Sequence, residues 1–202
     1  MNKIMFNDKY GLTKSVLEGK KTQTRRFIPK EFFTLQWDER DDTLVVENEF
    51  GDFIDIRNTK FCMLKVGEIV AVAQNYTACG GFMDDGTPRW DYISCIVGSK
   101  NRGWSNKMFV KPELMPHQIK ITNVRIERLQ DISDDDCLAE GVEKIISEDG
   151  TPRYYVKDWK GDTILATYTP QNAYSFLIDK VGKKGDWDSN PYVFVYDFEL
   201  IK

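Results

Sequence analysis

The residues best suited to chemistry lie together in one short stretch, Leu17–Arg26, with the sequence LEGKKTQTRR. It holds four cations, two threonine hydroxyls and one glutamine amide. A guanidinium binds phosphate through a fork of two hydrogen bonds, an ammonium adds a point charge, and an amide can pair with the edge of a base. The stretch therefore predicts a site for an anion or a nucleobase. The alternative is a solvated edge strand whose charges prevent aggregation.

A short helix followed by a strand should position this stretch. Leu12, Val16 and Leu17 have the spacing of one helical face, and Gly19 is placed to end the helix with a positive φ. Side chains alternate across an extended strand. One face would carry Thr22, Thr24 and Arg26, and the other Lys21, Gln23 and Arg25.

Composition excludes a protein that coats nucleic acid through its overall charge. The 202 residues carry a formal charge of −4, so affinity for nucleic acid has to come from a local basic patch. That patch would comprise Lys14, Lys20, Lys21, Arg25, Arg26 and Lys30. The length and the 41% hydrophobic content predict a single domain, residues 1–202.

The four cysteines predict neither a metal site nor a disulfide framework. They are far apart, no Cys-x-x-Cys pair occurs, and His117 is the single histidine. We expect no metal and no other cofactor. The chain also lacks a long apolar run or a cleavable leader, so we expect a cytoplasmic protein with reduced thiols and no membrane partner.

The first half of the chain should be mostly strands. A hairpin is predicted over residues 43–56, and residues 69–73 form a uniformly apolar, buried strand. The region 74–117 is rich in glycine and loses its periodicity, which predicts an elaborated, loop-rich insertion in which residues 92–97 resemble a strand.

The second half predicts strands joined to helices. Residues 118–128 indicate one long strand with a bulge near Thr122-Asn123, because the apolar phase shifts there. Ser133 is an N-cap for a short helix that ends at Gly141, and the three aspartates after it favour capping over metal binding. A hairpin is predicted over 143–167, a helix from Thr169-Pro170 to Gly182, and a last strand over 192–200.

Several separated segments resemble the ASCH superfamily, in particular its phage-associated members. They are the opening through LEGKKTQTRR, Val66-Gly67-Glu68, the strand-to-helix junction 124–141, and Trp187–Pro191 before the final strand. The resemblance implies an α+β fold built on a PUA-like β-barrel, with short helices packed over it. It also implies RNA binding.

One segment departs from the pattern of this superfamily. Its members usually continue the central strand with Trp-Val-Arg-Glu-Thr-Trp, whereas this chain has Ala71–Tyr76, AVAQNY. The charged Arg–Glu pair is lost. Gln74 and Asn75 keep hydrogen-bonding groups for a ligand, and Tyr76 offers a ring on which a base could stack.

The resemblance extends to one enzymatic branch of the superfamily, the acetylcytidine amidohydrolases. Their Gly-x-Lys-Thr-x-Thr segment is matched by Gly19–Thr24, which implies catalytic roles for Lys21 and Thr24. Glu140 occupies the place of the third catalytic residue. A desolvated lysine can act as the base that activates a threonine hydroxyl, and Glu140 could orient it or protonate the leaving amine. The alternative is a structural ion pair between Lys21 and Glu140.

Three functions from different classes follow. The first is binding of RNA or a modified nucleoside or nucleotide, through the ligand-binding residues Lys20, Gln23, Arg25, Arg26, Gln74, Asn75 and Tyr76. The second is an amidohydrolase acting on an N-acylated cytidine through Lys21, Thr24 and Glu140. The third is a phage-derived protein–protein adaptor, which the acidic net charge favours.

Overall fold

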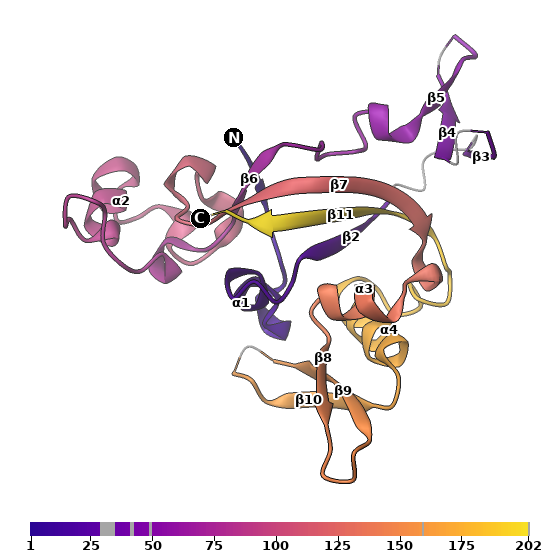
Figure 1. The fold of residues 1–202 in the computed structure, drawn as a ribbon. Helices are drawn as coiled ribbons and strands as arrows, with labels where there is room; N and C mark the ends of the chain where they lie inside the picture. Colours follow the sequence, from indigo (N-terminus) through magenta and orange to yellow (C-terminus); the bar gives the residue numbers. More distant parts are fainter. Residues whose placement is uncertain (29–34, 41–42, 49, 159, 202) are drawn as a thin grey trace.

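The computed structural model describes residues 1–28, 35–40, 43–48, 50–158 and 160–201. It is a mixed α+β structure made mostly of sheets, with few helices (Figure 1). The main sheet has five strands in the order β1–β6–β7–β11–β2. Its strands are β1 (Asn2–Ile4), β6 (Ile69–Val72), β7 (Gln118–Arg128), β11 (Tyr192–Leu200) and β2 (Gln23–Phe27). β1 runs parallel to β6, and the other neighbours are antiparallel.

The expectation of a closed β-barrel was wrong. β1 and β2 form the two edges of the main sheet, and no strand ladder joins them within the described residues. β1 is three residues long, so it offers little backbone for a second ladder. A side chain bridges the gap instead, because Arg26 on β2 donates from Nη2 to the carbonyl oxygen of Met5 at 2.8 Å. We call this gap between β1 and β2 the seam.

The predicted bulge in the long strand is confirmed. β11 pairs with β7 through Asp197 opposite Asn123 and then Phe198 opposite Ile121, so Thr122 is the extra residue. The bulge allows Ile121 and Val124, which are an odd number of positions apart, to be buried together. β7 and β11 thereby form the long curved centre of the sheet (Figure 1).

Two three-stranded sheets lie outside the main sheet. One comprises β3 (Gln36–Asp38), β4 (Thr43–Glu47) and β5 (Phe53–Asp55), the other β8 (Glu143–Ile146), β9 (Pro152–Lys157) and β10 (Thr163–Thr167). β4 and β5 form the hairpin predicted over 43–56. The second region holds two hairpins where one was expected, since both glycine-containing turns connect antiparallel strands.

Three helices lie on one side of the main sheet: α1 (Leu12–Leu17), α3 (Asp134–Ala139) and α4 (Pro170–Val181) (Figure 1). Their predicted ends are confirmed. The Ser133 hydroxyl accepts from the Asp136 N–H, and the Thr169 hydroxyl caps α4 ahead of Pro170. Gly19 has φ 69°, and the N–H groups of Gly19 and Lys20 bond back into the last turn of α1.

The insertion 74–117 contains a helix where a strand was expected. α2 (Arg89–Val97) includes residues 92–97, and Ile93 and Val97, four residues apart, pack on a small second core around Tyr76. The run has no clear period, so it is compatible with a strand or a helix, and the helix is the form that packs Ile93 and Val97 on the second core. Short 3₁₀ helices complete the insertion: η3 (Tyr76–Ala78), η4 (Arg102–Trp104), η5 (Lys107–Phe109) and η6 (Pro112–Leu114).

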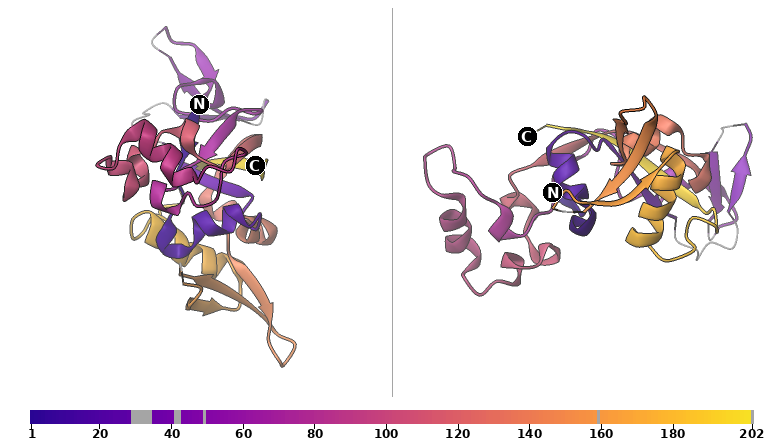
Figure 2. Two further views of the ribbon diagram at one scale, coloured as in Figure 1. Left: turned by 90° about the vertical axis from the view of Figure 1, so that its left-hand side faces the viewer. Right: turned by 90° about the horizontal axis from the view of Figure 1, so that it is seen from below.

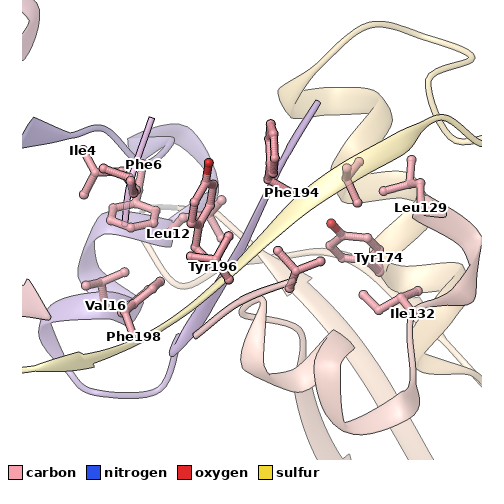
Figure 3. Packing of buried hydrophobic residues seen from close by; sticks show 14 of the residues in the cluster. Ile4, Phe6, Leu12, Val16, Leu129, Ile132, Tyr174, Phe194, Tyr196 and Phe198 are labelled. Atoms are coloured by element: carbon pink, nitrogen blue, oxygen red, sulfur yellow. The ribbon is translucent and has the colours of Figure 1, made fainter. Parts of the chain in front are cut away.

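The main core combines residues of the main sheet, the three helices and the segment 44–64. β11 supplies Phe194, Tyr196 and Phe198 to it, and Tyr174 of α4 packs near Leu129 and Ile132 (Figure 3). The insertion and the β3–β5 sheet lie at opposite ends of the main sheet (Figure 2). The remaining 3₁₀ helices are η1 (Asp8–Tyr10), η2 (Ile56–Asn58) and η7 (Leu129–Asp131).

Candidate functional site

Local backbone geometry brings the predicted segment against α3. The helix α1 ends at Gly19, and the following residues pass directly into β2. The Thr22 N–H donates to the carbonyl oxygen of Ala139 at 2.9 Å. This bond places the start of β2 beside the C-terminal end of α3, where Glu140 lies.

Lys21 and Glu140 form a buried ion pair. Lys21 Nζ lies 2.5 Å from Glu140 Oε2, and both side chains are almost fully inaccessible to solvent. Nζ also donates to the carbonyl oxygens of Gln23 at 2.6 Å and Glu140 at 2.8 Å. An ammonium has three donors, and here each has an acceptor. Burial lowers the pKa of Lys21, and the attraction of Glu140 offsets this only in part.

Arg25 is enclosed by carboxylates. Its Nη2 lies 3.0 Å from Asp136 Oδ2 and its Nη1 lies 3.2 Å from Glu140 Oε1. Glu127 accepts from Nε at 2.9 Å and also contacts Nη2. The side chain is 1% exposed. The guanidinium is thus bound within the protein rather than presented to a ligand.

The ion pairs extend across β7 and β11. Arg125 Nη2 lies 2.7 Å from Asp136 Oδ2, and its Nη1 lies 2.7 Å from Asp197 Oδ2. Gln23 donates from Nε2 to Asp136 Oδ1 at 2.8 Å and to Asp197 Oδ1 at 2.7 Å. We call this cluster the ionic network; it consists of Lys21, Gln23, Arg25, Arg125, Glu127, Asp136, Glu140 and Asp197.

The network confirms the predicted strand alternation but includes partners that sequence reasoning missed. Gln23 and Arg25 share one face of β2, as expected, and Lys21, which precedes the strand, reaches the same network. Arg125 and Glu127 were not anticipated, although they alternate with the apolar Val124 and Ile126 on a strand. A charged residue at every second position of a half-buried strand was the available signal. Asp136, interpreted as a capping residue, also binds both arginines.

Hydrogen bonds and charges in the network also shift the pKa of Asp136. Partial burial alone would raise it. The hydrogen bond from Gln23 and the charges of Arg125 and Arg25 outweigh that effect, so the pKa is lowered. Asp136 is therefore held as a carboxylate.

The three residues proposed for catalysis line one small pocket. Lys21, Thr24 and Glu140 share it with Tyr174, and it measures about 40 Å³. Its remaining lining residues are Phe6, Asn7, Leu12, Arg25, Arg26, Leu177, Ile178 and Val181. Lys21 precedes the first residue of β2, so the strict alternation that would separate it from Thr24 does not apply. We call this space the inner pocket.

Arg26 differs from Arg25 in its partners. Its bond to Met5 bridges the seam, and within the described part of the chain it has no carboxylate partner at ion-pair distance. It lines a second pocket of about 360 Å³ at the seam, together with Lys3 and Lys60. The other lining residues are Asn2, Ile4, Met63, Leu64 and Tyr196. We call this the seam pocket.

Four other predicted ligand residues lie elsewhere. Lys20 pairs with Glu18 at 2.6 Å on the surface. Asn75 caps η3 by accepting from the Ala78 N–H, and the Tyr76 hydroxyl accepts from the Lys111 N–H inside the second core. Gln74 is buried beside Met115. These four residues line neither the inner pocket nor the seam pocket.

Lys14 of the predicted basic patch pairs with Glu18 at 3.8 Å, and Lys30 lies outside the described residues.

In the described ranges no group of three or more His, Cys, Asp or Glu side chains is arranged to hold a metal ion. The helices described here include none long and apolar enough to cross a bilayer.

Comparison with known proteins gives no relative. The chain matches no protein-family model, no curated protein and no solved structure.

Proposed function

We propose that this is an ASCH-like protein that binds RNA or a modified nucleoside or nucleotide at the seam, with a phosphate held by Arg26. The observation that carries the proposal is the charge of the seam pocket. Lys3, Arg26 and Lys60 line it, and none of the described lining residues is acidic. A chain with a net charge of −4 thus has a local cluster of positive charge.

The shape and lining of the seam pocket suit a nucleotide unit. Its volume of about 360 Å³ falls within the range of small-molecule sites. Ile4, Met63 and Leu64 supply an apolar wall for a base, while the guanidinium of Arg26 can grip a phosphate through a fork. Lys3 is held in place by the carbonyl oxygens of Met108 and Val110, at 2.7 and 2.8 Å.

The test measures the anisotropy of a fluorescein-labelled single-stranded 12-mer RNA in low salt, with a mononucleotide as competitor. We expect Arg26→Ala and Lys60→Ala each to weaken binding about tenfold, because each removes a phosphate contact. Lys120→Ala is the matched control, since Lys120 is a half-exposed lysine on β7 outside the seam pocket. Equal losses in all three variants would show a nonspecific charge effect and contradict the proposal.

A second function, hydrolysis of an N-acylated cytidine, is favoured by the inner pocket. Lys21, Thr24 and Glu140 line it together, as the resemblance to amidohydrolases requires. In this reaction the Thr24 hydroxyl attacks the acyl carbonyl and passes its proton to neutral Lys21. The nucleoside amine leaves with a proton, and water then hydrolyses the acyl ester to acetate and restores Thr24.

For this function Lys21 has to lose its proton first. Burial favours the neutral form, whereas the three acceptors around Nζ favour the ammonium. The test is release of acetate from N4-acetylcytidine by the wild-type protein. Thr24→Ala should abolish turnover while RNA binding at the seam is retained. Absence of acetate release above background from wild-type protein would eliminate this candidate.

A further inference from the structure

Tyr174 has a buried hydroxyl for which the described residues provide no partner. The side chain is 1% exposed, it lines the inner pocket, and its hydroxyl makes no hydrogen bond there. An unpaired buried polar group costs stability of the order of a hydrogen bond, so native structures usually pair such groups with protein, water or ligand. An occupant of the inner pocket would supply the missing partner.

The hydroxyl can act only as a neutral donor or acceptor. Burial, reinforced by the nearby charge of Glu140, raises the pKa of Tyr174 well above its usual value. The guanidinium carbon of Arg25 lies 5.8 Å from the centre of the tyrosine ring. With its proton retained, Tyr174 offers an O–H donor to an acceptor on an occupant.

The formal charges around the pocket sum to zero. Three cations, Lys21, Arg25 and Arg125, form ion pairs with four carboxylates, Glu127, Asp136, Glu140 and Asp197. The fourth cation, Arg26, lines the pocket but has no carboxylate at ion-pair distance among the described residues, and it donates to the Met5 carbonyl. Because a buried unpaired charge is costly, an ionised occupant would disturb this balance. The occupant that fits best is uncharged.

The size of the inner pocket and its apolar wall restrict the occupant further. About 40 Å³ leaves room for only a few heavy atoms, and α4 contributes the apolar Leu177, Ile178 and Val181. An uncharged group with one hydrogen-bond acceptor and a short apolar end meets these conditions. A short acyl group has this chemistry.

We propose that the inner pocket binds the short acyl group of a ligand, with its carbonyl oxygen accepting a hydrogen bond from the Tyr174 hydroxyl. This inference rests on the second proposed function and names the part of the substrate that the pocket takes. Tyr174 is then a residue that contacts substrate, in addition to Lys21, Thr24 and Glu140.

The test uses acetamide as an uncharged acyl probe and acetate as its charged counterpart of similar size. Both are titrated into the full-length protein with ¹³C-labelled methyl groups, at constant ionic strength, and the methyl signals of Leu177 and Ile178 report occupancy. We expect saturable shifts with acetamide and binding of acetate at least about tenfold weaker. Absence of saturable shifts with acetamide would mean that at most a water fills the pocket, and tighter binding of acetate would contradict the charge argument.

Tyr174→Phe removes only the hydroxyl and should leave the fold intact, because that hydroxyl has no partner in the described structure. We expect it to raise the acetamide dissociation constant about fivefold. Tyr154→Phe is the matched control, since Tyr154 is a buried tyrosine on β9 that does not line the inner pocket. An unchanged constant in Tyr174→Phe would overturn the role of Tyr174.

Two results separate this inference from the function on which it rests. If the protein releases acetate from N4-acetylcytidine but Tyr174→Phe changes neither KM nor acetamide binding, the inference fails and the enzyme function stands. If acetamide binds through Tyr174 but no acetate is released, the acyl site stands and the amidohydrolase function fails.

Discussion

Arg25 and Arg26 are adjacent in the sequence but have opposite surroundings. Arg25 is enclosed by Glu127, Asp136 and Glu140, and its side chain is 1% exposed. Arg26 reaches a backbone carbonyl and lines the seam pocket, where the described lining residues include two lysines and no acid. The partners of a cation therefore decide its role, and a run of basic residues does not by itself define a binding site.

The same contrast separates the two pockets. The inner pocket is lined by the ion-paired Lys21, Arg25 and Glu140 and by an apolar helix, and Arg26 lies in the wall of both pockets. The seam pocket has Lys3, Arg26 and Lys60 and no acid among its described lining residues. Paired buried charges hold elements together, while unpaired charges near solvent can attract an anion. Three experiments test whether the two arginines and the two pockets differ in this way.

The largest effect should come from removing Arg25. Arg25→Met leaves three carboxylates without their shared partner, and loss of one member of a buried ion pair costs about 3–5 kcal/mol. Arg26→Met should cost about 1 kcal/mol or less, because it removes one hydrogen bond to a carbonyl. Urea denaturation measures both free energies of unfolding. Similar losses in the two variants would remove the distinction between the arginines.

A smaller effect is expected from acidification of the ionic network. The pKa of Asp136 is lowered in the folded state, so its contribution to stability is complete above the unfolded value near 4. That contribution is lost as the pH falls through the lower, folded value. The difference in free energy of unfolding between wild type and Asp136→Asn should therefore be constant from about pH 5 to 7 and shrink below about pH 4. If this difference in free energy of unfolding stayed the same between pH 7 and values below pH 4, the result would contradict the contacts assigned to Asp136.

The smallest effect concerns the salt dependence of RNA binding. If Arg26 contacts a phosphate, Arg26→Ala should reduce the slope of log Kd against log salt by about 1. Lys120→Ala should leave the slope unchanged, because that lysine lies outside the seam pocket. Anisotropy titrations between 50 and 200 mM salt would measure both. If the slope were unchanged in Arg26→Ala, the RNA would bind to a surface other than the seam pocket.

Features that depend on neighbouring residues were predictable from the sequence. Gly19 ends α1, Ser133 and Thr169 begin α3 and α4, and Thr122 forms the bulge in β7. Each is a matter of backbone conformation or hydrogen bonding within a few residues. The strand alternation that places Gln23 and Arg25 on one face of β2 is local in the same sense.

The structure of residues 92–97 was not predictable in this way. The run is apolar without a clear period, so it is compatible with either a strand or a helix. Packing of Ile93 against the second core selected the helix.

Local sequence predicted a helix, a glycine turn and a charged strand in which Arg25 points to the face opposite Thr24 and Arg26. Which of these side chains are paired depends on contacts between segments far apart in the sequence. Glu140 lies 119 positions from Lys21, and Glu127 lies 102 positions from Arg25. Ion pairs depend on distances between side chains, which are set by the packing of the whole chain. The seam is open because the edge strands β1 and β2 do not pair with each other in the described structure. The sequence therefore placed the charges, and the fold determined which are neutralised and which face a pocket.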